Sequence, residues 1–248
     1  MRTENAVPKF IHVTERAQML KKVSYVLDAA KRLFWDIGLA KSILGKPNPW
    51  NPLPWISYPA IEFLNSMEME HIKMFEFGSG NSTLYWGQRL RQGHLSFFQS
   101  IESSPEYWGN MAKISGFYRD YTVLRKIKDD YLNYPYQLAT RFTNDESKLI
   151  PFDFMVVDGP IQWRVDELLV ALRLTHSEGI IMVDDTNWIA KDVERLCEEH
   201  SMFRVDFAGF GPGVSYTKVT SFLFRNPGWF LGNKVKTPMG GMQSFPGM

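Results

Sequence analysis

The chain has 248 residues, of which 44% are apolar and 15% aromatic, and its formal net charge at pH 7 is +1. An apolar fraction of this size supports a packed core and argues against wholesale disorder. The near balance of 28 basic and 27 acidic residues lacks the basic excess of nucleic-acid-binding proteins. We therefore expect no nucleic-acid partner.

The single cysteine, Cys197, excludes an internal disulfide and a multi-cysteine metal site. No apolar run is long enough to span a bilayer, so we expect no membrane association. The opening residues "MRTENAVPKF" lack the apolar core of a secretory signal. We expect a cytoplasmic protein and leave a homodimer open.

The first 70 residues are predicted to form an N-terminal helical extension. Apolar residues at helical spacing predict a helix over 14–38. Four prolines between residues 47 and 54 exclude regular structure there, and a helix beginning at Pro59 is predicted over 59–69.

From residue 73 onward, short apolar runs alternate with amphipathic stretches. This alternation predicts a mainly parallel sheet covered on both faces, in one domain over 71–230, followed by a flexible tail over 231–248. Hairpin spacing of the last two runs predicts an antiparallel strand at the end. The stretch 128–151 is assigned no element, and its segment "YLNYPYQLATRF" is interpreted as either a substrate-side loop or an insertion. The expected strands are 73–77, 95–103, 121–127, 152–159, 179–185, 203–211 and 217–226, with helices over 82–92, 105–115, 161–176 and 188–200.

A turn of small residues, Gly78-Ser79-Gly80-Asn81-Ser82, lies where the first of these strands meets a helix. Glycines there let the backbone approach a ligand at the carboxyl edge of a parallel sheet. The turn lacks the Gly-Lys-Ser/Thr of a phosphate loop, and Thr83 replaces the third glycine of the dinucleotide fingerprint. It therefore suits a nucleoside better than a pyrophosphate. The alternative is a plain strand–helix connection capped by Ser82 or Asn81.

Glu102 ends the second strand of the alternating region. An acidic side chain at that place can accept hydrogen bonds from ribose hydroxyls. The alternative is a solvated strand end.

The stretches "FEFGSGNST", "SIESSPEYW", "FDFMVVDGP" and "GIIMVDDTNW", in this order, resemble the class I S-adenosylmethionine-dependent methyltransferases over roughly residues 52–226. The segment "PLPWISYPAIEFLNSM" is similar to one found in a small-molecule and sugar O-methyltransferase-like subset. The resemblance implies an α/β, doubly wound, mainly parallel seven-stranded sheet whose last strand is antiparallel. It also implies S-adenosylmethionine as cofactor, bound by Glu76, Gly78, Ser79, Gly80, Asn81, Ser82, Glu102, Ser103 and Asp158.

Three carboxylates end the fourth and fifth strands: Asp158, Asp184 and Asp185. A right-handed crossover would bring these strand ends together, and clustered like charges favour protonation or a cation such as Mg²⁺. The resemblance to metal-dependent O-methyltransferases makes all three candidate metal ligands and makes Asp158 and Asp185 candidate catalytic residues. Pro160 departs from the pattern, since related sugar methyltransferases carry an acidic base there. The alternative is that these aspartates fix a turn, cap a helix or line the cofactor site.

Aromatic and basic residues flank these motifs. Trp55 and Tyr58 could close over the site or pack the extension on the sheet, and Trp163 and Trp188 follow the acidic motifs. Arg164 could pair with an acidic group of a substrate or with Asp158.

The sequence thus predicts methyl transfer from S-adenosylmethionine, with a small-molecule or carbohydrate oxygen as acceptor. One rival is a nicotinamide-dependent oxidoreductase, which needs a pyrophosphate-sized turn. The other is a non-catalytic nucleoside-binding protein of the same fold.

Overall fold

The computed structural model describes residues 52–67, 69–116, 118–141, 151–212, 214 and 216–226. The helix expected over 14–38 and the tail expected over 231–248 lie outside these residues. So does most of the N-terminal extension expected over 1–70, which therefore stays a prediction.

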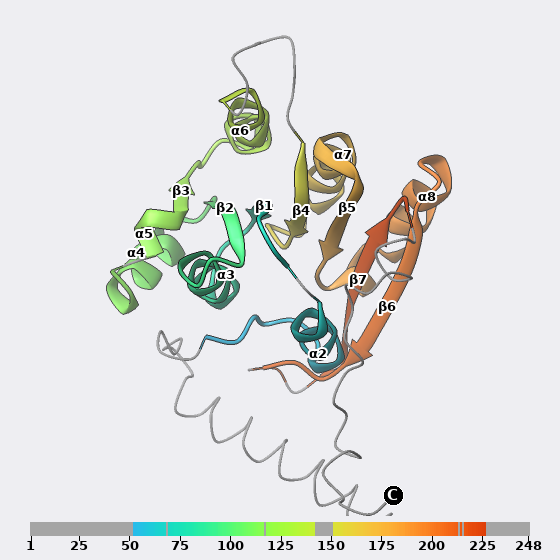
Figure 1. Cartoon of the computed structure of the whole chain (residues 1–248), viewed down its shortest axis with the longest axis horizontal. Helices are drawn as coiled ribbons and strands as arrows, with labels where there is room; N and C mark the ends of the chain where they lie inside the picture. Colours follow the sequence, from blue (N-terminus) through green and yellow to red (C-terminus); the bar gives the residue numbers. More distant parts are fainter. Residues whose placement is uncertain are drawn as a thin grey trace, which may run out of the picture. The chain divides into compact units, whose positions relative to one another are not determined.

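The centre of the fold is a seven-stranded sheet in the order β3-β2-β1-β4-β5-β7-β6 (Figure 1). Strands β1 to β5 run parallel, β7 is antiparallel to β5, and β6 is antiparallel to β7. The predicted α/β sheet with its antiparallel last strand is confirmed. The strands are β1 (Ile72–Phe77), β2 (Leu95–Glu102), β3 (Thr122–Leu124), β4 (Phe152–Val157), β5 (Thr175–Val183), β6 (Phe203–Gly209) and β7 (Lys218–Phe224).

Helix α2 precedes β1, the other helices lie between successive strands, and together they cover both faces of the sheet. They are α2 (Tyr58–Ser66), α3 (Asn81–Arg91), α4 (Pro105–Ile114), α5 (Tyr118–Tyr121), α6 (Lys128–Arg141), α7 (Arg164–Leu174) and α8 (Ala190–Glu199), with a 3-10 helix, η1 (Thr186–Trp188). None of the helices in the described ranges combines the length and the apolarity that crossing a membrane requires.

Helix α6 corrects the assignment of no element to the stretch from residue 128. Tyr131, Tyr134, Leu138 and Ala139 recur on one face at helical spacing and are buried against the sheet. Pro135 lies inside the helix. Proline removes a backbone donor, but burial of this apolar face outweighs the lost bond. The segment "YLNYPYQLATRF" is therefore not a substrate-side loop up to Arg141.

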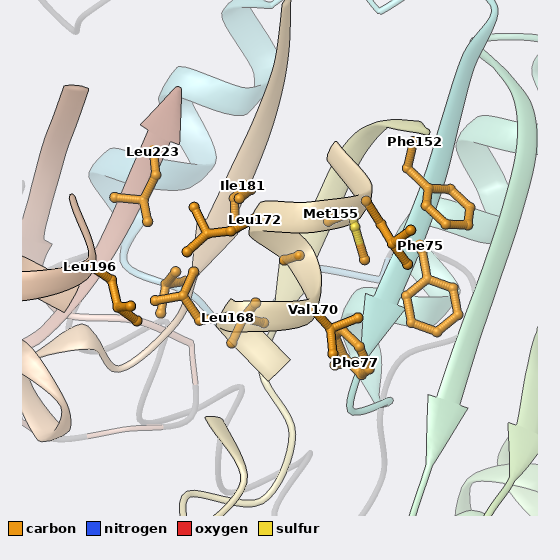
Figure 2. Packing of buried hydrophobic residues seen from close by; sticks show 14 of the residues in the cluster. Phe75, Phe77, Phe152, Met155, Leu168, Val170, Leu172, Ile181, Leu196 and Leu223 are labelled. Carbon is orange, nitrogen blue, oxygen red and sulfur yellow. The ribbon is translucent and has the colours of Figure 1, made fainter. Parts of the chain in front are cut away.

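Side chains of each central strand alternate between two apolar clusters. In β1, Phe75 and Phe77 join the cluster that α6, α7 and α8 cover, with Leu168 of α7 at its centre (Figure 2). Met74 points to the opposite face and joins the cluster that α2 and α3 cover. Both faces of the central strands are therefore buried, which explains their nearly continuous apolar sequences.

The pairing register brings the ends of the central strands to one edge. Phe77 of β1 pairs with Ile101 of β2 and with Val157 of β4, and Val157 pairs with Val183 of β5. The next residue of each strand therefore lies at the same edge: Gly78, Glu102, Asp158 and Asp184. Lys218, the first residue of antiparallel β7, also reaches this edge, since Ser221 pairs with Val183.

Candidate cofactor and acceptor site

The glycine turn lies against the loop that follows β4. Gly78 has φ = 78°, and a side chain there would collide with the backbone carbonyl of Asp158. The Gly78 N–H donates to the hydroxyl of Tyr131 at 2.8 Å. Only glycine allows this conformation and this close approach together.

Helix α3 begins at Asn81 with Gly80 as its N-cap, so neither Asn81 nor Ser82 caps it as the alternative reading required. The Gly80 N–H donates to Thr83 Oγ1 at 3.0 Å, and the Thr83 hydroxyl donates to Glu76 Oε2 at 2.6 Å. Glu76 is fully buried beneath the turn, and burial raises its pKa to about 7. The structure thus places Glu76 as a support under the turn.

Glu102 lies directly beside the glycine turn. Its Oε2 accepts hydrogen bonds from the backbone N–H (3.2 Å) and the hydroxyl (2.8 Å) of Ser79. Its Oε1 accepts from the N–H groups of Ser103 (2.7 Å) and Ser104 (2.8 Å). The carboxylate therefore joins the loops after β1 and β2, and the reading of Glu102 as a solvated strand end does not fit its 7% exposure.

Oxygen atoms of Asp158, Asp184 and Asp185 all lie within 4.8 Å of one another. Their backbones extend the sheet, because the Asp158 N–H donates to Phe77 O and the Asp184 N–H donates to Val157 O. Asp185 has left-handed backbone angles (φ 48°, ψ 40°) and precedes η1 without a side-chain cap. The structure thus brings the three carboxylates together next to Gly78.

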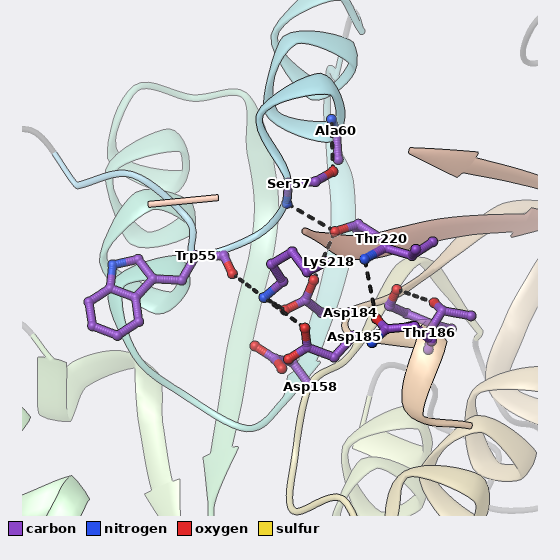
Figure 3. A network of polar contacts seen from close by, with 12 residues as sticks. Trp55, Ser57, Ala60, Asp158, Asp184, Asp185, Thr186, Lys218 and Thr220 are labelled. Carbon is purple, nitrogen blue, oxygen red and sulfur yellow. Dashed lines mark hydrogen bonds and ion pairs between the residues drawn. The ribbon is translucent and has the colours of Figure 1, made fainter. Parts of the chain in front are cut away.

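Lys218 neutralises the inner part of this acidic cluster (Figure 3). Its ammonium lies 2.5 Å from Asp184 Oδ2, 3.2 Å from Asp185 Oδ1 and 2.7 Å from the carbonyl oxygen of Trp55. The hydroxyl of Thr220 donates to the other Asp184 oxygen at 2.8 Å. Lys218 was not predicted as a site residue, although a lysine at the start of the last strand, two residues before Thr220, is an available signal.

Arg164 neutralises the outer part of the cluster. Its NH2 group lies 2.8 Å from Asp158 Oδ1, and its NH1 group lies 3.8 Å from Asp185 Oδ2. Two further bonds, from Nε to Gly159 O and from NH1 to Asp184 O, fix the guanidinium. Arg164 was expected to pair with an acidic group of a substrate or with Asp158, and the structure shows the pair with Asp158.

Asp158 retains a pKa well above its usual range. Burial is the main cause, the charge of Asp184 adds to it, and the charges of Arg164 and Lys218 oppose it. Three carboxylates face two cations in this cluster, so one negative charge is left without a compensating cation. A carboxylate in this setting is a stronger proton acceptor than one in water.

The cluster does not fit a divalent metal ion. Asp184 is 1% exposed and both of its carboxylate oxygens already accept short bonds, so an ion could not reach it without displacing Lys218. The ammonium and the guanidinium also compensate two of the three carboxylate charges, which weakens the attraction of the cluster for Mg²⁺. The expected magnesium site is therefore not supported.

Several aromatic side chains lie around this edge. Trp55 and Trp188 expose 41% and 61% of their surfaces, whereas Trp163 packs on Tyr131 with ring centroids 5.3 Å apart. The Tyr58 N–H donates to Phe210 O, which attaches the start of α2 to the residue that follows β6. Tyr107 of α4 was not predicted as a site residue, although its hydroxyl lies 2.8 Å from where a Cβ on Gly80 would stand.

Comparison with known proteins identifies the fold. Neither a protein-family model nor a curated protein matches the chain. An O-methyltransferase from Bacillus cereus in complex with SAH matches at 15% identity over 79% of this chain and 96% of that chain, with a TM-score of 0.53. Cofactor-bound Rv0187 from MTB matches at 14% identity over 80% of this chain and 97% of that chain, with a TM-score of 0.52. The chain has the fold of the class I S-adenosylmethionine-dependent methyltransferases.

Proposed function

We propose that this protein binds S-adenosylmethionine and transfers its methyl group to an oxygen atom of a small molecule or sugar. One juxtaposition carries the proposal: the glycine turn contacts Glu102 through Ser79 and contacts the backbone of Asp158 through Gly78. A nucleoside-binding turn and a proton acceptor are therefore neighbours at one edge of the sheet.

The cofactor half of the site would be the turn from Gly78 to Ser82, together with Glu102 and Ser103. The residues present fit an adenosyl group, because Asn81 Oδ1 is buried without a hydrogen-bond partner in the described part of the chain. Glu102 would exchange its bond from the Ser79 hydroxyl for one from a ribose hydroxyl, while Glu76 supports the turn from below. The bound cofactor would supply an electrophilic methyl group on a sulfonium sulfur.

The acceptor half of the site would be Asp158 with Asp185. With Pro160 at the position of the acidic base in related enzymes, Asp158 is the base that we propose. Its side chain is 30% exposed, so an acceptor hydroxyl can reach it, and Arg164 fixes one of its oxygens. Asp158 would accept the proton of the acceptor hydroxyl as that oxygen takes the methyl group, and the methyl–sulfur bond would break with its electrons staying on sulfur, so that S-adenosylhomocysteine leaves. Much of the remaining rate enhancement would come from alignment of the two reactants.

The two rivals predict different ligands or different turnover. A nicotinamide-dependent oxidoreductase requires a larger turn than the one at Gly78. A non-catalytic nucleoside-binding protein would keep the turn and Glu102 for ligand binding but would not use Asp158 as a proton acceptor.

Calorimetric titration with S-adenosylhomocysteine and with NAD distinguishes the proposed methyltransferase from a nicotinamide-dependent oxidoreductase. We expect S-adenosylhomocysteine to bind and Glu102→Gln to weaken its binding by about tenfold or more, because a hydrogen bond to a charged group contributes about 1.5–3 kcal/mol. Glu106→Gln, an exposed residue of α4, is the matched control. Tighter binding of NAD, or identical binding in the two variants, would contradict the proposal.

Measurement of turnover distinguishes the proposed enzyme from the non-catalytic nucleoside-binding protein. With a panel of hydroxyl-bearing sugars and phenols, we expect native protein to release S-adenosylhomocysteine and Asp158→Asn to lower kcat by about 10²–10⁴-fold. Asp153→Asn is the control, since Asp153 lies on β4 and accepts a bond from the Lys73 N–H. Equal turnover in all three proteins would remove Asp158 from the chemistry.

A further inference from the structure

We propose that Lys218 takes the place of a divalent cation in this acidic cluster, so that the site is complete without a bound metal. The inference rests on the proposed function only in treating this edge as the acceptor side. Its evidence is the geometry around the ammonium group.

The ammonium of Lys218 has three N–H donors, and three oxygen atoms surround it. They are Asp184 Oδ2 at 2.5 Å, the Trp55 carbonyl at 2.7 Å and Asp185 Oδ1 at 3.2 Å. A carboxylate pair and a backbone carbonyl are also the donor types that hard divalent cations use in proteins. The ammonium donates hydrogen bonds to Asp184 and to the Trp55 carbonyl and lies in ion-pair contact with Asp185, so it occupies an oxygen set that would otherwise attract such an ion.

These three oxygens come from different parts of the chain. Trp55 precedes α2, whereas Asp184 and Asp185 follow β5. The Ser57 N–H adds a bond to Thr220 Oγ1 at 3.1 Å, and that hydroxyl in turn donates to Asp184 (Figure 3). Lys218 thus fixes the segment before α2 beside the carboxylates, a task that a shared metal ion could otherwise perform.

Burial makes this arrangement exclusive. Lys218 is 4% exposed and Asp184 is 1% exposed, so the ion pair is not open to exchange with solvent ions. Removing one partner of a buried pair leaves an uncompensated charge. In a protein without the lysine charge, a divalent cation from solution becomes the available source of compensation.

Lys218 is accordingly a positioning residue, and its test measures binding of Mn²⁺ alone by electron paramagnetic resonance. Native protein and Asp185→Asn are titrated first. In native protein we expect no saturable Mn²⁺ site that depends on Asp185. One saturable site per chain that Asp185→Asn abolishes would overturn the inference.

Lys218→Met then removes the charge and keeps much of the side-chain length. We expect it to gain a saturable Mn²⁺ site that is at least about tenfold tighter than any Mn²⁺ binding by native protein, because the ion no longer meets an ammonium a few ångströms away. The double variant with Asp185→Asn should lose that gain. Lys218→Arg keeps the charge and should show no gain. A purely structural role for Lys218 would destabilise the Met variant without creating an ion site.

Circular dichroism establishes whether Lys218→Met is folded, and Lys218→Gln replaces it if it is not. A folded neutral variant that gains no Mn²⁺ site would overturn the inference. Titration of the same samples with S-adenosylhomocysteine separates this inference from the proposed function. Failure of S-adenosylhomocysteine to bind native protein, with the Mn²⁺ results as expected, would remove the function and leave the role of Lys218 standing.

Discussion

Gly78 meets two constraints, a positive φ and a close contact with a neighbouring backbone, and comparison with Gly93 separates them. Its φ of 78° is costly for residues with a side chain, and a Cβ would also collide with the Asp158 carbonyl. Gly93 has φ = 82° but no atom within 4 Å of the position that a Cβ would take. The two glycines therefore differ in close approach and not in backbone conformation.

We expect Gly93→Ala to lower the free energy of unfolding by about 1 kcal/mol and to leave S-adenosylhomocysteine binding unchanged. Gly78→Ala should cost about 1–3 kcal/mol more, because the loops after β1 and β4 must move apart, and it should weaken that binding. Urea unfolding and calorimetry measure the two quantities. Equal effects of the two substitutions would show that the close approach is unimportant.

At the scale of elements, α6 supports the turn from the helical layer. Tyr131 is fully buried, accepts the Gly78 N–H at 2.8 Å, and packs on Phe77 with ring centroids 5.5 Å apart. Its hydroxyl and the carboxyl of Glu167 also crowd the Cα of Gly159, where a side chain would collide with both. Helices α6 and α7 therefore hold the two glycine loops of the site in place.

We expect Tyr131→Phe to lower the free energy of unfolding by about 1–3 kcal/mol, since it leaves the buried Gly78 N–H without an acceptor. S-adenosylhomocysteine should bind more weakly, because the turn loses its support. Tyr134→Phe, on the same helix and nearly as buried, should change stability by less than about 0.5 kcal/mol. The idea fails if the two variants melt and bind alike.

At the scale of the whole molecule, a buried carboxyl makes stability depend on pH. Glu167 of α7 has no exposed surface, and its Oε2 accepts the Gly159 N–H at 3.1 Å. Burial raises its pKa from 4.5 to about 8, against the opposing charge of Arg164 and a hydrogen bond from Tyr131, while Glu102 adds to the rise. The folded state therefore binds this proton more tightly than the unfolded state does.

Stability should be highest below pH 4.5 as far as this group is concerned, and it should fall as pH rises through about 8. The loss attributable to Glu167 is on the order of 5 kcal/mol. We expect Glu167→Gln to reduce the fall in unfolding free energy between pH 5 and pH 8.5, measured in urea. Glu194→Gln, on the exposed face of α8, should keep the native pH dependence. A native slope in the Glu167 variant would refute this assignment.

The sequence alone predicted the fold and most of the residues at the edge. Continuous apolar runs such as "FMVV" indicate parallel strands buried on both faces, and parallel strands must end at one edge. Gly78, Glu102 and Asp158 could therefore be grouped without coordinates. Helix α6 could not be predicted in this way, since Pro135 weakens its local pattern and only burial against the sheet reveals the helix.

Only the tertiary structure decided how the acidic edge is neutralised. Asp158, Asp184 and Asp185 are visible in the sequence as strand ends, and their convergence suggested a metal ion. Lys218 lies 34 residues beyond Asp184, and the β6–β7 hairpin returns it to the same edge by antiparallel pairing. Strand ends follow from local patterns, whereas the partner of a buried charge follows from which distant segments pack together, and that choice separates a metal site from an internal ion pair.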